Sequence, residues 1–465
     1  MNFSKEVYET HRKLSNCSAK FLEFVKDNPA SLKRSNYSKV LHPNFDAGKT
    51  QPWPVFINQR TKQEMKEACI SVANLIKSIP QRMFSNDITN ISWYYGVPEA
   101  MVKFYLDGLI DEHLENLLGR GDFILSPSGL KCVEYNISAG IGGWQIAVLE
   151  SLYLNTPVIA KFLQEYQVKT LNKNLNSILL EHLLTIAVKK FSPGSSCNDI
   201  NIAIALPNYR KSADQIMVEK HFNQLYNHML HLKYSHLQGE VIICDFLHFN
   251  IDNGCTFYED KRIHVLVEFH HGDVPPEIMD VFKRGNILLF NGPITGLLAN
   301  KLNLVILSES EDSDFFTLPE REAIKKYIPW TRKLTAGNTR FEGMTFNLQD
   351  FVLSNREKMV LKPTGGLGGE DVFIGRCTPR AQWEKLIKNA TGERNWIVQE
   401  YSESLPFLFQ VHSNGCTEHH AIWGLFAFGG RYAGGFLRIL PKDNGKGVIN
   451  TRQGAEKTVI FEVEE

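Results

Sequence analysis

The feature that most constrains this fold is a pair of apolar strands joined by a glycine-rich loop. Lys362 lies in the first strand, and the loop holds four glycines in five positions, Gly365, Gly366, Gly368 and Gly369. Without Cβ atoms, backbone N–H groups can approach an anion closely, and successive N–H groups form a concave site for phosphate. The lysine adds a positive charge. The segment predicts a phosphate-binding loop, although a hairpin loop without a ligand fits the same pattern.

Residues 395–401 predict a further buried strand, downstream of this loop. It ends in three polar residues, Gln399, Glu400 and Tyr401. Such a strand end can offer backbone groups and a carboxylate to the edge of an adenine, so the two segments predict a nucleotide held between two pieces of sheet. The P-loop and the dinucleotide fingerprint are absent, because Pro43 and Asp371 stand where each motif needs a glycine.

An acidic hairpin is predicted far upstream. Residues 119–125 and 131–137 read as two strands joined by a turn at 126–129. Arg120 and Asp122 share one face of the first strand, and Glu134 and Asn136 share one face of the second, because side chains alternate along a strand. If the faces coincide, two carboxylates and an amide oxygen converge, a set that suits Mg²⁺. A solvated hairpin with a cross-strand ion pair is the alternative.

Residues 169–309 alternate between helical and strand patterns. Helices are predicted at 171–191 and 213–232, and short apolar strands at 201–206, 241–245, 264–269 and 286–290. This alternation predicts a parallel sheet with helices on its faces. Nearer the N-terminus, helices are predicted at 61–79, 98–118 and 144–153. The histidine pairs 270–271 and 419–420 are interpreted as solvated loop residues.

In this order, the segments resemble circularly permuted ATP-grasp ligases, in particular the glutathionylspermidine synthase-like enzymes. The Arg-x-Asp and Glu-x-Asn pairs resemble the magnesium hairpin of that family. Segments 94–98, 291–302, 434–438 and 448–451 resemble further family motifs. After Asn136 the sequence departs from the synthases, and too few residues precede the hairpin for an amidase domain. The resemblance therefore implies the ligase chemistry without implying glutathione or spermidine as substrates.

The resemblance implies an α/β and α+β fold, a circularly permuted ATP-grasp with an inserted Rossmann-like preATP-grasp domain. The implied domains are an N-terminal helical region with the magnesium hairpin (1–165), the Rossmann-like domain (166–310), and the lid with the C-terminal grasp strands (311–465). The implied ATP-binding residues are Lys333, Lys362, Gly365, Gly366, Gly368, Gly369, Gln399, Glu400 and Tyr401. The implied Mg²⁺ ligands are Asp122, Glu134 and Asn136, and the implied catalytic residues are Arg120 and Arg438.

The implied reaction is ATP-dependent joining of a carboxylate to an amine through an acyl phosphate, with release of ADP and phosphate. The substrates would be small molecules, the amine being an amino acid, a peptide, a polyamine or a carrier-bound amine. A noncatalytic ATP-binding regulatory module and a small-molecule kinase are the alternatives.

Composition predicts a cytoplasmic enzyme. Lys plus Arg and Asp plus Glu number 51 each, so no global field favours nucleic acid or an anionic membrane. The eight cysteines lack Cys-x-x-Cys spacing, which is typical of reduced thiols in a core. The N-terminus has no apolar signal core, and no stretch reaches the length of a transmembrane helix.

Overall fold

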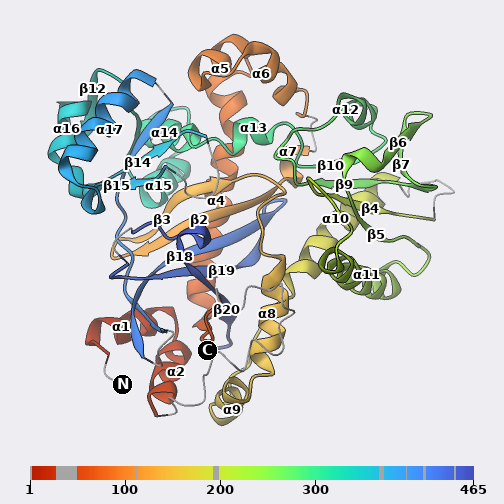
Figure 1. The fold of residues 1–465 in the computed structure, drawn as a ribbon, viewed down its shortest axis with the longest axis horizontal. Coiled ribbons are helices and arrows are strands. Elements are labelled where there is room, and N and C mark those ends of the chain that lie inside the picture. Colours follow the sequence, from red (N-terminus) through yellow and green to blue (C-terminus); the bar gives the residue numbers. More distant parts are fainter. Residues whose placement is uncertain are drawn as a thin grey trace.

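The computed structural model describes residues 3–27, 50–109, 113–191, 198–365, 371–393, 395–411, 415–444 and 447–465. Within them the chain forms a mixed α and β structure built on three larger sheets. A seven-stranded sheet lies at the centre, a four-stranded parallel sheet lies on one side of it, and a four-stranded antiparallel sheet lies on the other (Figure 1).

The central sheet joins the two ends of the chain. Its strands run in the order β1-β20-β19-β18-β2-β3, and β17 also pairs with β18. Their bounds are β1 Val55–Ile57, β2 Leu118–Ser126, β3 Gly129–Asn136, β17 Phe407–Gln410, β18 Cys416–Phe428, β19 Arg431–Pro441 and β20 Glu456–Glu462. β1 runs parallel to β20, and the other pairs are antiparallel. The hairpin β2–β3 therefore lies beside strands from the far end of the sequence.

Helix α4 (Gln59–Phe84) packs against β2, β3, β18 and β19 of this sheet. The Asn58 side chain caps the helix by accepting a hydrogen bond from Thr61 N at 2.9 Å. Buried apolar residues then recur at helical spacing from Met65 to Ile79. The helix predicted at 61–79 is confirmed and continues to Phe84.

The parallel sheet has the order β10-β9-β4-β5 and carries the predicted alternation of helices and strands. Its elements are α10 Leu175–Phe191, β4 Ile202–Ala205, α11 Ala213–Lys233, β5 Val241–Cys244, β9 Val265–Glu268, α12 Pro276–Lys283 and β10 Leu288–Phe290. A small antiparallel sheet is inserted, made of β6 Phe249–Asp252, β7 Cys255–Tyr258 and β8 Lys261–Arg262. Continuous apolar strands are expected in a parallel sheet, whose two faces are both covered.

The third sheet has the order β11-β16-β14-β15 and its own hydrophobic core. Its strands are β11 Thr331–Lys333, β14 Met359–Pro363, β15 Phe373–Ile374 and β16 Trp396–Glu400. Helices α16 Leu348–Ser354 and α17 Arg380–Glu393 contribute to the same core, and β12 Asn338–Phe341 pairs with β13 Met344–Asn347. Residues 311–465, assigned from sequence to one domain, thus contribute to both this sheet and the central one.

The remaining α-helices cover the sheets or connect them. They are α1 Lys5–Leu14, α2 Asn16–Asp27, α5 Ile88–Tyr95, α6 Glu99–Leu106, α7 His113–Asn116, α8 Trp144–Leu154, α9 Pro157–Glu165, α13 Thr295–Leu298, α14 Leu302–Glu309 and α15 Leu318–Tyr327. The expected continuous helix over 98–118 is wrong. Asp107 and Gly108 end α6, and β2 already begins at Leu118.

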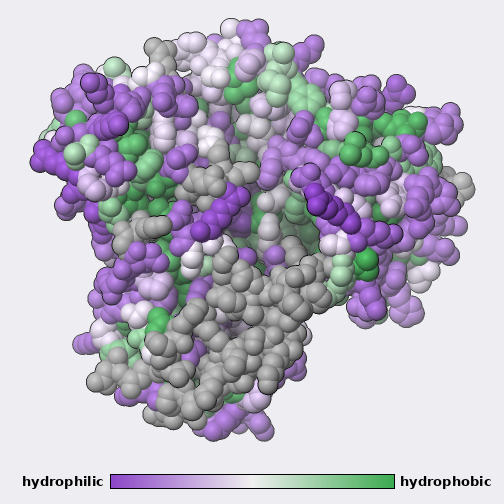
Figure 2. Space-filling model, viewed as in Figure 1, coloured by the Kyte–Doolittle hydropathy of each residue, from purple (hydrophilic) through white to green (hydrophobic). Residues whose placement is uncertain are grey.

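The surface seen in Figure 2 is predominantly hydrophilic, with scattered hydrophobic residues. In the described part of the chain, no single helix combines the length and apolar composition of a membrane span. The helix pair Gln145–Leu154 and Pro157–Glu165, bent by 66°, meets those criteria only when its two members are taken together.

Candidate functional site

The site begins with the register of the hairpin β2–β3. Asp122 is paired with Glu134 and Arg120 with Asn136, so the two polar faces coincide. The register shifts between Asp122 and Phe123, because Val133 is an extra residue on β3. Without this bulge Asp122 would pair with Val133, and both Glu134 and Asn136 would point to the opposite face of the sheet.

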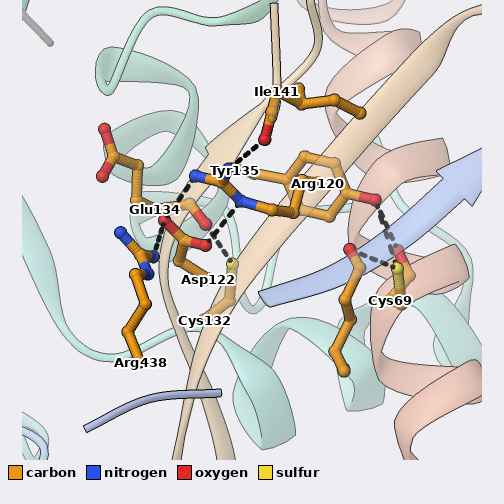
Figure 3. Close-up of polar contacts among 9 residues, drawn as sticks. Cys69, Arg120, Asp122, Cys132, Glu134, Tyr135, Ile141 and Arg438 are labelled. Carbon is orange, nitrogen blue, oxygen red and sulfur yellow. Dashed lines mark hydrogen bonds and ion pairs between the residues drawn. The ribbon is translucent and has the colours of Figure 1, made fainter. Parts of the chain in front are cut away.

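Two arginines hold the Asp122 carboxylate. Arg120 Nε donates to Asp122 Oδ1 at 2.9 Å, and Arg438 Nη2 lies 2.6 Å from Asp122 Oδ2. Figure 3 shows the Arg120 side chain between Asp122 and the Ile141 carbonyl, to which its Nη1 donates, while Arg438 approaches Asp122 from the other side. Burial alone would raise the pKa of Asp122, but the two guanidinium groups outweigh it and lower the pKa below its ordinary value.

Lys362 connects the third sheet to this hairpin. Its Nζ donates to Val133 O at 3.1 Å and to Gln399 Oε1 at 2.7 Å. Val133 is the bulged residue, so a carbonyl in the irregular part of the ladder accepts from the lysine. Gln399 is itself fixed, because its Nε2 donates to Thr331 Oγ1 at 3.1 Å. The acidic hairpin and the lysine strand, far apart in the sequence, therefore meet.

Burial makes the charge on Lys362 costly. The side chain is 8% exposed, and this burial lowers its pKa from 10.5 to about 8 even though Glu134 favours the charged form. A second lysine, Lys301, lies in the same region, and its Nζ is 3.1 Å from Glu134 Oε1. Four cationic side chains thus surround two carboxylates.

Two adjoining cavities open onto these groups. The first, here called the hinge cavity, has a volume of about 110 Å³. The second, the hairpin cavity, has a volume of about 360 Å³. Both are lined by Asp122, Glu134, Lys301, Gly365, Arg438 and Asn450.

The two cavities differ in chemical character. The hinge cavity adds Lys362 and an apolar set formed by Ile124, Val133, Val360, Val372, Ile374, Ile422, Val448 and Ile449. Residues 399–402 close one side of it, and their strand end is fixed because Glu400 N donates to Trp330 O and Tyr401 N to Lys358 O. The hairpin cavity adds small and polar residues, among them Asn136, Ser138, Gly140 and Thr295. A flat apolar group fits the first cavity, and a small polar group fits the second.

Most of the site residues expected from sequence come together here. Lining at least one of the two cavities are Arg120, Asp122, Glu134, Asn136, Lys362, Gly365, Gln399, Glu400, Tyr401 and Arg438. The expected phosphate-loop residues Gly366, Gly368 and Gly369 lie outside the described residues. Lys333 is not among the lining residues of either cavity, and its Nζ donates to Tyr94 O at 2.8 Å. Its neighbour Arg332 bonds Ser308 and Thr331 instead.

The structure adds residues that sequence reasoning did not assign to the site. Lys301 stands at the N-terminal end of α14, inside segment 291–302, and the resemblance of that segment to a family motif was the available signal. Asn450 lies in segment 448–451 and His271 in the histidine pair 270–271, but each comes from a loop, so its place in the site depends on the tertiary fold. The reading of residues 419–420 as a loop is wrong, since both lie in β18 and His420 lines the hinge cavity.

One buried donor in the site lacks a protein acceptor. Arg438 is 8% exposed, and its Nε has no hydrogen-bond partner among the described groups. Buried donors are almost always satisfied, so such a group in a cavity is available to a water molecule or to a ligand acceptor. An anion is the natural complement to a guanidinium N–H.

The hairpin face also suits a hard cation. In the described residues no group of three or more His, Cys, Asp or Glu side chains is placed to hold a metal ion. Asp122, Glu134 and Asn136 nevertheless present two carboxylates and one amide on one face, which are oxygen donors of the kind that Mg²⁺ takes. In this structure the two carboxylates are paired with Arg120, Arg438 and Lys301. Comparison of this chain with models of known protein families and with curated proteins gave no match.

Proposed function

We propose that this chain is an ATP-dependent carboxylate–amine ligase with a circularly permuted ATP-grasp fold, similar to glutathionylspermidine synthase-like enzymes. The observation that carries the proposal is the contact between Lys362 Nζ and Val133 O. Through it, the strand that leads into the glycine loop meets the acidic hairpin at one pair of cavities. The mixed α and β architecture, with a parallel-stranded unit between these two segments in the sequence, is compatible with that fold.

The hinge cavity suits the adenine of ATP. Val360 and Ile374 on the third sheet and Ile422 and Ile449 on the central side provide apolar surfaces, while residues 399–402 provide polar groups for the edge of the base. Gly365 lines both cavities, and a Cβ atom at that position would meet nothing within 4 Å. No protein atom of the described residues therefore requires a glycine there, and we assign this space to phosphate oxygens.

The charge of the site suits MgATP. Over the two cavities, four cationic side chains (Arg120, Lys301, Lys362 and Arg438) face three carboxylates (Asp122, Glu134 and Glu400), which leaves a formal excess of one positive charge. Magnesium-bound ATP carries the opposite charge. Fixed cations in a site of low dielectric constant stabilise such an anion more strongly than water does. Arg438 Nε supplies a donor that no described protein group accepts.

Asp122, Glu134 and Asn136 would hold Mg²⁺. When bound, the ion neutralises charge on the phosphate oxygens of the nucleotide. Lys301 is placed to hold Glu134 in position, and Arg120 holds Asp122 against the loop at Ile141. Lys333 has no part in the proposal, because its Nζ lies at Tyr94.

In the proposed reaction, ATP occupies the hinge cavity and the acid substrate occupies the adjoining hairpin cavity. A substrate carboxylate in the hairpin cavity lies beside Arg120 and Arg438 and attacks the γ-phosphorus, which gives an acyl phosphate and ADP. An amine then attacks the acyl carbon, forms the amide and releases phosphate. Arg438 and Lys362 stabilise the transferring phosphoryl group, and loss of one such cation typically lowers kcat by roughly 10²-fold or more.

A product assay tests the proposal. The protein is incubated with MgATP and a mixture of carboxylic acids and amines, and ADP, phosphate and new masses are measured. Amine-dependent release of ADP and phosphate with an amide product is expected. A stable phosphorylated product formed without an amine would indicate a kinase, and ATP binding without turnover would indicate a noncatalytic module.

Substitutions of three site residues test whether the activity depends on the proposed site. Arg120→Ala, Glu134→Ala and Lys362→Ala should each lose turnover and keep the fold. Lys358→Met is the matched control, because Lys358 is an exposed lysine four positions before Lys362. Wild-type ADP release by all three site variants would contradict the assignment of the site.

A further inference from the structure

A third cavity, here called the apolar cavity, lies against the parallel sheet. Its volume is about 260 Å³, and it is enclosed by α10, α11 and strands β4, β5 and β9, with Leu118 and Phe428 from the central sheet. None of the described residues that line it is charged. The polar side chains among them, Asn176 and Gln215, are hydrogen-bonded to His221 and to the Ser212 backbone N–H, respectively.

The uncharged, apolar lining of this cavity limits the kinds of ligand that it can bind. Protein interiors are close-packed, so a large void in a folded domain is unusual. An apolar cavity of about 150 Å³ is already large enough to bind small apolar molecules, and this one is larger. With no described charge in its lining, it has nothing to offer a phosphate, a sugar or an ionised group. Its complement is an aliphatic or aromatic group.

Its place in the sheet is also typical of a ligand site. Ile202 and Ile204 of β4 point to the same face of the sheet, and Leu206 continues that face beyond the carboxyl end of the strand. The chain passes from β4 to β5 on one side and returns to β9 on the other. Parallel sheets bind ligands outside the carboxyl ends of their strands, at such a reversal of strand order.

Two loops contribute residues to the lining of both the apolar cavity and the hairpin cavity. In the first loop Ser138 and Gly140 face the hairpin cavity, Ala139 and Gly142 face the apolar cavity, and Ile141 borders both. In the second, Phe269 faces the apolar cavity and His271 the hairpin cavity. The Ile141 carbonyl also accepts from Arg120 Nη1. The apolar cavity thus adjoins the place where a substrate carboxylate would lie.

We propose that the apolar cavity binds the aliphatic chain of the carboxylic acid substrate, whose carboxylate lies in the hairpin cavity. This inference rests on the proposed function and names its substrate class. The acid, and not the amine, is assigned to this cavity because Arg120, the residue beside the carboxylate, is bonded to the loop that borders it. The substrate would then be a fatty acid or an amino acid with a long apolar side chain.

Equilibrium binding of straight-chain carboxylates without ATP tests the inference. Acetate, hexanoate and decanoate are titrated into the full-length protein by calorimetry. The affinity should rise about four-fold per added methylene until the cavity is filled, with one decanoate bound per chain. Decanoate should also raise the melting temperature, because it binds only the folded state.

Two substitutions on α10 localise the binding. Leu179 lines the apolar cavity, whereas Ile186, also half-buried on α10, does not. Leu179→Trp fills the cavity and should weaken decanoate binding at least ten-fold, while Ile186→Trp should leave it unchanged. Thermal melts without ligand check that both variants are folded.

The outcomes separate this inference from the proposed function. Equal affinity for acetate and decanoate, or equal decanoate binding by the wild type and Leu179→Trp, would overturn the inference and leave the ligase proposal intact. Decanoate binding that Leu179→Trp abolishes would support the apolar cavity even if the protein released no ADP with any amine.

Discussion

Replacing Lys362 with methionine tests whether this lysine stabilises the fold or instead serves to bind a ligand. Methionine keeps the length and apolar stem of the side chain and removes the buried ammonium group. Burial lowers the pKa of the lysine from 10.5 to about 8. Since one pKa unit corresponds to about 1.4 kcal/mol, the charged form costs the folded protein about 3 kcal/mol at neutral pH.

The substitution also removes two hydrogen bonds. Val133 O and Gln399 Oε1 lose their lysine donor, and a buried acceptor left unsatisfied costs about 1 kcal/mol or more. The two effects nearly cancel. We therefore expect the free energy of unfolding of Lys362→Met at pH 7 to lie within about 2 kcal/mol of the wild-type value.

The pH dependence of the free energy of unfolding distinguishes the wild type from Lys362→Met more clearly than its value at pH 7. Between the folded pKa of about 8 and the unfolded value of 10.5, the unfolded wild-type chain holds one more proton at this position than the folded protein. The free energy of unfolding of the wild type therefore rises with pH in this window, relative to the variant, by about 1.4 kcal/mol per pH unit. Below pH 8 the lysine is charged in both states, and the difference is flat.

Urea denaturation of the wild type, Lys362→Met and Lys358→Met at pH 7, 8, 9 and 10 measures this difference. The wild type should gain about 2 kcal/mol over Lys362→Met between pH 8 and pH 10, because only the variant lacks the buried titrating group. Lys358→Met should follow the wild type. A difference between wild type and Lys362→Met that stays constant over this range would refute the reasoning about the buried charge.

Three other substitutions test the site and Gly143, the residue that precedes α8 beside the loop at Ile141. Asp122→Asn leaves two buried guanidinium groups without their carboxylate, so it should lower the free energy of unfolding by roughly 3–5 kcal/mol, and a thermal melt close to that of the wild type would contradict the pairing. Glu134→Gln keeps the side-chain shape and should raise the Mg²⁺ concentration needed for half-maximal ADP release about ten-fold or more, whereas an unchanged requirement would place the ion elsewhere. Gly143→Ala puts a Cβ 2.2 Å from Phe426 Cζ at a φ of +94°, so it should destabilise the fold by at least about 1 kcal/mol, and a neutral result by urea denaturation would show that the loop can relax.

The sequence predicted local elements well where apolar periodicity was strong. The helix at 61–79 and the strands of the parallel sheet were expected from their spacing, and β2–β3 was expected from its turn. The break after α6 was missed, because Asp107 and Gly108 were read as part of one long periodic helix. Local pattern alone does not reveal where a chain must turn to enter a distant strand.

The site was predictable in part, for a similar reason. Alternation along the two hairpin strands placed the polar residues on common faces, but the bulge at Val133 that aligns those faces was not visible in the pattern. Lys333 matched a spacing, yet its stem runs toward Tyr94. Lys301 and His271 lie in segments that the sequence analysis had noted, but only the fold shows that they face the site, because contacts across a cavity produce no periodic pattern in the sequence.

Calorimetric titration of the full-length protein with ATP, in the presence and absence of Mg²⁺, tests the central claim most directly. The account predicts one ATP per chain in the presence of Mg²⁺, binding that Lys362→Met weakens at least ten-fold and Lys358→Met leaves unchanged, and a Mg²⁺ requirement that Glu134→Gln shifts to about ten-fold higher concentration. ATP binding equal in the wild type and Lys362→Met, or no heat of binding at millimolar ATP, would contradict it.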